Sequence, residues 1–272
     1  MIKSILTIAL GTLALAVASP AFAGYPTTYA AQGGRGVASR DGALHFVAYK
    51  QGDDTRLTAL RTPSGALVRS VTLTGAFGVP MLGNHSIALG MFRDGTTFVL
   101  QSVAAGPETT FQLVGTDDLA VRDTITLRGA FAFDALSPDG SMLYLIQHRA
   151  ADDQQHYVVR AYDLQRKTLL PGRIADRAQK SWVMQGWPSA RAETANGRWV
   201  YTLYANPGGF PFVHALDTVR GVAHCVGIAW RGEQGPLFDY RLHVRGNRLL
   251  VQRHDGSLYR AINRTTWAVR AR

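Results

Sequence analysis

The stretch that decides the fold is Asp134 to Gln147, "DALSPDGSMLYLIQ". A strand ends on the turn Ser-Pro-Asp-Gly and is followed at once by the apolar run Met142 to Ile146. Asp-Gly is a preferred hairpin turn because glycine accepts a positive φ without steric cost. The apolar residues at successive positions of the second strand predict that both of its faces are buried between neighbouring sheets.

The same pattern, a polar turn that ends in glycine and is followed by a strand, occurs five times. The turn glycines lie 45 to 57 residues apart and define the length of one repeat: Gly42, Gly95, Gly140, Gly197 and Gly246. A further strand follows in each repeat, and in four repeats it contains alanine followed by Leu, Tyr or Ile. A polar turn and another short strand come after it. Each repeat therefore predicts four antiparallel strands.

The third repeat resembles the blades of secreted bacterial β-propellers of the YVTN, TolB and WD40-like class, on Leu136 to Ile146 and Val158 to Leu164. This resemblance implies an all-β fold in which four-stranded antiparallel blades pack face to face around an axis. Five repeats predict five blades, or six if residues 24–34 and 77–83 add strands. We expect Tyr25 to Ala31 to close the ring by pairing with the last blade. The alternative that fits short, evenly spaced strands is an open β-sandwich.

The N-terminus predicts an export signal. Lys3 precedes the apolar run Ile5 to Val17, and Ala21-Phe22-Ala23 has small residues at the two positions that signal peptidase reads. The run is shorter than the roughly 20 residues of a bilayer span. We therefore expect a signal peptide over residues 1–23, cleavage after Ala23, and a secreted or periplasmic protein without a transmembrane anchor. Residues 24–272 would form one propeller domain.

Net charge and cysteine content limit the partners. The formal net charge is +10, and nearly all of the basic residues are arginines that are scattered along the chain. This charge favours anionic partners such as acidic polysaccharide, a phosphate-rich wall polymer or a membrane surface, although a protein partner stays open. Nucleic acid does not fit an exported chain. Cys225 is the single cysteine, so no intramolecular disulfide forms. We expect a monomer without cofactor or metal.

Carboxylate chemistry has few candidates in this sequence. The resemblance includes five-bladed glycosidases, whose funnel holds a separated acid and base. Glutamates are few, and most aspartates fall in predicted turns, where they cap their own backbone: Asp41, Asp94, Asp139, Asp217 and Asp255. Asp134, in the predicted innermost strand of the third repeat, is the one acidic residue placed to face a central channel.

Nucleophilic catalysis has weaker support. His85 and Ser86 are adjacent, and adjacent strand residues point to opposite faces, so they do not form a hydrogen-bonded pair. Cys225 within a strand is typical of a small buried hydrophobe rather than a nucleophile. We therefore assign no catalytic residue, and the enzyme question stays open with the balance toward a non-enzyme.

One pair of histidines has the spacing of a partial metal site. A turn over Asp217 to Gly221 would place His214 directly opposite His224 on one face of a hairpin. Without a third ligand, the simpler interpretation is two separate histidines, because a register shift by one residue would put them on opposite faces.

The segment Arg177 to Glu193 is predicted to be a loop between the third and fourth repeats. It mixes Trp182 and Trp187 with Arg191, residue types that recognition surfaces favour. Packing of either tryptophan between blades is the preferred alternative, because burial stabilises a large aromatic side chain.

Three functions remain. The first is a non-catalytic binding module for an envelope or extracellular partner, with Trp182, Trp187, Arg191, Asp134, His214 and His224 as binding candidates. The second is a hydrolase or lyase that acts on a glycan or lactone in the axial funnel. The third, implied by the resemblance, is an envelope assembly factor similar to TolB-like propellers.

Overall fold

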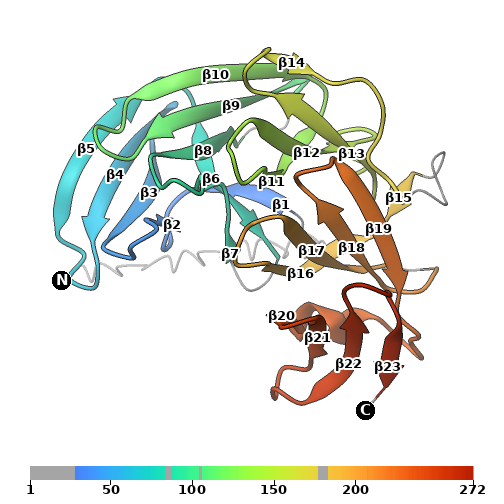
Figure 1. The fold of residues 1–272 in the computed structure, drawn as a ribbon. Helices are drawn as coiled ribbons and strands as arrows, with labels where there is room; N and C mark the ends of the chain where they lie inside the picture. Colours follow the sequence, from blue (N-terminus) through green and yellow to red (C-terminus); the bar gives the residue numbers. More distant parts are fainter. Residues whose placement is uncertain (1–27, 84–86, 104–105, 177–182, 207, 272) are drawn as a thin grey trace, which may run out of the picture.

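The computed structural model describes residues 28–83, 87–103, 106–176, 183–206 and 208–271. Over these residues the chain forms five antiparallel sheets that follow one another along a curved path (Figure 1). Each sheet is one blade of a β-propeller, and each corresponds to one repeat of the sequence. The expected all-β fold with five blades is confirmed.

The strands of each blade run outward from the axis in chain order. The first blade contains β2 (Val37–Ala38), β3 (Leu44–Gln51), β4 (Asp54–Arg61) and β5 (Leu67–Leu73). The second contains β6 (Phe77–Leu82), β8 (Thr97–Ser102), β9 (Glu108–Gly115) and β10 (Val121–Arg128), with β1 (Thr28–Ala31) and β7 (Ile87–Ala88) added to β6.

The remaining blades follow the same order. The third contains β11 (Phe131–Leu136), β12 (Met142–His148), β13 (His156–Asp163) and β14 (Thr168–Leu169), with β15 (Met184–Gln185) added to β13. The fourth contains β16 (Trp187–Glu193), β17 (Trp199–Ala205), β18 (Phe212–Asp217) and β19 (Val222–Gly227). The 3-10 helix η2 (Gly235–Asp239) leads to the fifth, which contains β20 (Arg241–Arg245), β21 (Arg248–Gln252), β22 (Leu258–Asn263) and β23 (Val269–Ala271).

The repeated turns have the geometry that their glycines predict. The five turn glycines have positive φ values between 53° and 74°. In the first four blades the glycine N–H donates to the carbonyl three residues earlier, as Gly140 does to Ser137. The turn aspartates accept backbone N–H groups of their own turns: Asp41, Asp94, Asp139, Asp217 and Asp255. Their capping role is confirmed.

Apolar packing joins each blade to the next. Buried side chains form shared clusters between the first and second blades, the second and third, the third and fourth, and the fourth and fifth. None of the five buried clusters among the described residues holds side chains of both the first and the last blade. The described core is therefore an arc of blades, and Figure 1 shows the last blade set apart from the first.

The N-terminal strand does not pair where we expected. Of the predicted closing segment Tyr25 to Ala31, the described part is β1, and it pairs with β6 of the second blade, from Thr28 opposite Leu82 to Ala31 opposite Val79. The prediction was wrong because β6 is the innermost strand of the second blade: β7 and β8 pair along one of its edges, and its other edge is open to β1. A Cβ on Gly78 would lie 2.7 Å from the Ala31 carbonyl oxygen, so this glycine permits the close approach of β1.

The predicted signal peptide, residues 1–23, lies outside the described residues. In the part of the chain that the structure describes, no helix has the length and apolar character to cross a membrane.

Candidate functional site

The predicted channel carboxylate is held in a buried ion pair. Asp134 lies on the innermost strand β11, and Arg191 lies on the innermost strand β16 of the next blade. Their Oδ1 and Nη2 atoms are 3.2 Å apart, and the two side chains are 3% and 2% exposed. A β-bulge between Phe133 and Ala135 leaves Asp134 without an opposite residue on β12, and bulges of this kind re-aim the side chain. Asp134 therefore neutralises Arg191 rather than lining an open funnel.

Further polar side chains lie close to this pair between the third and fourth blades. We call Asp134, Arg191, Tyr157, Tyr204 and His214 the interblade polar cluster. Oδ2 of Asp134, Nε and Nη1 of Arg191 and Nε2 of His214 are buried and have no hydrogen-bond partner among the described residues. The two tyrosine rings stack with centroids 5.3 Å apart. Low dielectric makes such a cluster sensitive to any change in charge.

Burial fixes the protonation states of this cluster. It lowers the pKa of His214 to about 4, so the imidazole is neutral at neutral pH. It raises the pKa values of Tyr157 and Tyr204 well above their ordinary value, so both stay protonated. Groups whose pKa values lie this far from 7 keep one protonation state near pH 7 and do not exchange protons there. The cluster therefore has the properties of a structural polar core.

The two candidate histidines do not face each other. The turn after β18 is one residue shorter than expected, so Asp217 pairs with Val222 and His214 lies opposite Cys225. His214 and His224 thus lie on opposite faces of the hairpin. His224 Nδ1 is 3.0 Å from Asp176 Oδ2. Within the described residues, no group of three or more His, Cys, Asp or Glu side chains is arranged to hold a metal ion.

Cys225 has a poor environment for a nucleophile. Burial, with a smaller contribution from the Asp176 charge, raises the pKa of its thiol to about 12. Its backbone N–H donates to Asp176 Oδ2 at 2.7 Å, and its Sγ atom is 3.6 Å from His214 Nδ1. A thiol with so high a pKa is almost entirely protonated near pH 7.

The predicted recognition loop is largely strand. Residues 187–193 form β16, the innermost strand of the fourth blade, so the prediction of a loop through Glu193 was wrong. The two-residue strand β15 precedes it. Trp187 is partly buried against the core shared by the fourth and fifth blades. Trp182 lies outside the described residues.

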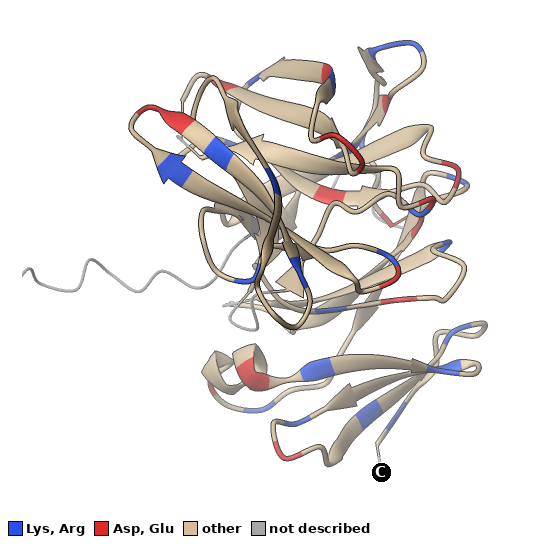
Figure 2. Cartoon of the chain, turned by 90° about the vertical axis from the view of Figure 1, so that its left-hand side faces the viewer, with Lys and Arg blue, Asp and Glu red and all other residues tan. Residues whose placement is uncertain are grey.

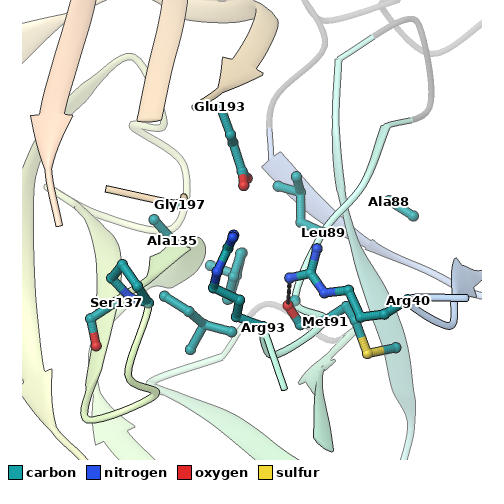
Figure 3. A pocket seen from close by; sticks show the side chains of 13 residues that line it. Arg40, Ala88, Leu89, Met91, Arg93, Ala135, Ser137, Glu193 and Gly197 are labelled. Carbon is teal, nitrogen blue, oxygen red and sulfur yellow. Dashed lines mark hydrogen bonds between the residues drawn. The ribbon is translucent and has the colours of Figure 1, made fainter. Parts of the chain in front are cut away.

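A small pocket opens where the turns of the first four blades approach one another (Figure 3). Its volume is about 110 Å³, below the roughly 300–1,000 Å³ of a typical ligand site. Arg40 donates from Nε to the Phe92 carbonyl and from Nη2 to the Met91 carbonyl, each at 2.9 Å. Arg93 donates to the carbonyl of Ala195 in the fourth blade. The arginines therefore connect the blades around this pocket.

The last blade presents a different kind of surface. Alternate residues of β20 and β21 point away from the fourth blade, and strand register brings Arg241, His243, Arg245, Arg248 and Arg270 to the same side. We call these five residues the arginine face. All five are exposed, and the structure gives no ion pair to any of the four arginines within the described residues. Figure 2 shows the basic segments on this blade, which ends at the C-terminus.

The arginine face was absent from our sequence candidates. The signal that could have found it is the strand period: Arg241, His243 and Arg245 alternate with apolar residues, and Arg248 follows a two-residue Gly-Asn turn. We had counted the arginines as scattered, which they are along the chain but not on the folded blade.

Comparisons with known proteins support the fold. No protein-family model matches the chain, and no curated protein does. Among solved structures it is similar to the β-propeller domain of Cps50 (Swd1) from Myceliophteria thermophila, with a TM-score of 0.53, 12% identity, and coverage of 87% of this chain and 67% of that one.

Two further structures match at comparable levels. Hydrazine synthase from Kuenenia stuttgartiensis has a TM-score of 0.51 and 13% identity, over 82% of this chain and 62% of that one. A putative 6-phosphogluconolactonase from Bacteroides uniformis has a TM-score of 0.50 and 15% identity, over 86% and 68%. The chain thus spans less than two thirds of the hydrazine synthase chain. At these identities the likeness shows a β-propeller fold and no particular activity.

Proposed function

We propose that this chain is an exported, non-catalytic binding module for an envelope or extracellular partner. The observation that carries the proposal is the arginine face, a side of the last blade that, among the described residues, shares no buried cluster with another blade and bears four arginines without an ion pair. Exposed surface of one charge, free of internal partners, is available to attract a partner of the opposite charge. The signal-like residues 1–23 support export.

The buried ion pair argues against the funnel-hydrolase alternative. A glycosidase needs two carboxyl groups that reach the substrate from opposite sides of the scissile bond. Asp134 was the candidate for one of them, and it is buried against Arg191. The described structure therefore favours binding over hydrolysis at the axis.

The experiment is affinity capture by the mature protein, residues 24–272, from an envelope extract of its own cells, with bound molecules identified by mass spectrometry at low and high salt. We expect capture of a defined envelope component by the wild type. A variant with Arg245→Ser and Arg248→Ser should lose this capture, and one with Arg61→Ser and Arg69→Ser, which removes the same charge from the first blade, should retain it.

The other outcomes distinguish the remaining hypotheses. Failure of the wild type to capture any component would overturn the binding proposal. A salt-resistant complex with envelope proteins, kept by both variants, would instead favour an envelope assembly factor similar to TolB-like propellers. Light scattering on the same sample tests the expected monomer, and sequencing of its secreted N-terminus tests cleavage after Ala23.

A further inference from the structure

We infer that the arginine face binds a linear envelope polymer that carries an anionic group, carboxylate or phosphate, on successive repeat units. This inference rests on the binding function proposed above and specifies its ligand class. It depends on three observations: an internal repulsion, the spacing of the arginines, and the lack of an exposed large apolar side chain on this face.

The first observation is a like-charge pair. Arg245 and Arg248 are directly opposite across the β20–β21 hairpin. Like charges at directly opposite positions destabilise a sheet, and the structure gives neither guanidinium a carboxylate partner within the described residues. The folded chain therefore carries a local repulsion that no described contact relieves. An anionic group bound between the two guanidiniums would relieve it, because arginine binds carboxylate and phosphate in bidentate geometry.

The second observation is the spread of the charges. Arg241 and Arg245 are separated along β20 by about 13 Å at the usual rise per strand residue. Arg270 lies on the outermost strand, beside Ala261 of β22. A single small anion cannot contact arginines so far apart. A polymer with regularly spaced charges contacts several of them at once and gains affinity from each additional contact.

The third observation is the composition of the face. Its centre is His243, Leu250 and Ala261, which are adjacent across β20, β21 and β22. The exposed large apolar residues of the described chain all lie elsewhere. Stable protein interfaces usually have an apolar centre with aromatic anchors. Leu250 and Ala261 are both partly buried, and none of the three central residues is Phe, Tyr or Trp, so charge rather than apolar burial would dominate binding, as with a flexible polyanion.

The test measures binding of the mature protein to purified polymers by calorimetry. The probes are a long oligogalacturonate for the carboxylate source, poly(glycerol phosphate) for the phosphate source, and neutral dextran as control. We expect at least one polyanion to bind, with an affinity that falls as salt rises, and the corresponding monomer to bind far more weakly. The polymer that binds identifies the source of the anionic group.

Paired variants locate the site. Arg245→Ser with Arg248→Ser should weaken polymer binding on the order of tenfold and reduce the salt dependence, because fewer ion pairs form. The same variant should raise the melting temperature by roughly 1–3 °C, since the repulsion is removed. Arg61→Ser with Arg69→Ser should leave polymer binding within twofold of the wild type.

Three results would overturn the inference: no binding to either polyanion, equal affinity for monomer and polymer, or equal loss in both paired variants. The last would mean that net charge alone causes the attraction. If the wild type captures an envelope protein but binds neither polymer, the binding module stands and the assigned ligand class fails. A melting temperature lowered in the first variant would show a structural role for the two arginines.

Discussion

At the scale of single residues, the environment of Asp134 separates a packing role from a role in an open funnel. The residue lies at a β-bulge on the innermost strand, a position that in an open funnel would present a carboxylate to a substrate. Here its nearest charged partner is Arg191, and both side chains are almost completely buried. The same residue type in the same place thus serves packing between blades.

Removal of this carboxylate should be severe. Asp134→Ala is expected to lower the free energy of unfolding by about 3–5 kcal/mol, because it leaves the buried Arg191 guanidinium uncompensated. The double variant Asp134→Leu, Arg191→Met is expected to be more stable than this single variant, since apolar residues can replace a buried ion pair. Urea unfolding at neutral pH measures both. A loss below about 1 kcal/mol in the single variant would show that Arg191 is solvated.

His214 should make stability depend on pH in a defined window. Its pKa is about 4 in the folded chain against 6.5 for an ordinary histidine. Between these values the unfolded chain binds a proton that the folded chain does not. The free energy of unfolding should therefore decrease as pH falls from 6.5 toward 4, by up to about 1.4 kcal/mol per pH unit.

The matched comparison is His214→Gln, which removes the titrating group and should flatten the profile in that window. His148, whose pKa burial also lowers, remains in both proteins and contributes equally to both. Urea unfolding at a series of pH values gives the two profiles. Profiles of equal slope would mean that His214 is hydrated and titrates normally.

At the scale of strands and turns, the repeated glycine turn is the element most readable from sequence. A polar turn that contains glycine and precedes an apolar run is a local signal, and all five turns formed where it occurs. Pairings that depend on distant residues left no such signal. The pairing of β1 with β6 joins residues about fifty positions apart, and it depends on an edge that only the folded second blade leaves open.

The position of a side chain was predictable only where the face of the strand on which it lies was certain. Asp134 was correctly placed on an innermost strand, but its bulge and its partner Arg191 follow from the packing of two blades. The prediction that His214 faces His224 was wrong because the turn between their strands is one residue shorter than expected. A shift of one residue moves every side chain of a strand to the opposite face.

Alanine substitutions at two turn glycines distinguish the cost of backbone strain from the cost of side-chain crowding. Gly42 and Gly140 have almost the same φ, 71° and 70°. A Cβ on Gly42 would meet nothing within 4 Å, whereas one on Gly140 would lie 3.0 Å from the Phe92 ring. Gly42→Ala should lower the free energy of unfolding by about 1–2 kcal/mol through the left-handed backbone alone.

Gly140→Ala should be more destabilising than Gly42→Ala, because its Cβ would also crowd the buried Phe92 ring. Urea unfolding of the two variants measures the difference. If Gly42→Ala proved the more destabilising variant, crowding at Phe92 would be excluded as a contribution. Equal losses would mean that the ring gives way without strain.

At the scale of the whole molecule, the blades differ in how many neighbouring blades they pack against. Among the described residues, the second, third and fourth blades share buried clusters with a neighbour on each side, whereas the first shares one with the second alone and the fifth shares one with the fourth alone. Local unfolding draws on regions with the fewest buried apolar contacts. The two end blades of the arc, the first and the last, should therefore open before the three blades between them.

Hydrogen exchange tests this order. Amides of β21 and β22 in the fifth blade are expected to exchange with a lower free energy of opening than amides of β12 and β17 in the third and fourth blades. The difference should narrow when a polyanion occupies the arginine face, because a ligand that binds only the folded blade stabilises it. Uniform protection across all blades would mean that the arc unfolds as one cooperative unit.

The place of β1 also sets an order of events during synthesis. It is the first described strand of the chain, yet its partner β6 begins at Phe77. As the chain emerges from the ribosome N-terminus first, β1 is exposed while the whole first blade is made. Its free edge is then open to any other strand. The first described strand to be synthesised, β1, therefore stays unpaired until β6 has been made. During this interval β1 can pair with a wrong strand.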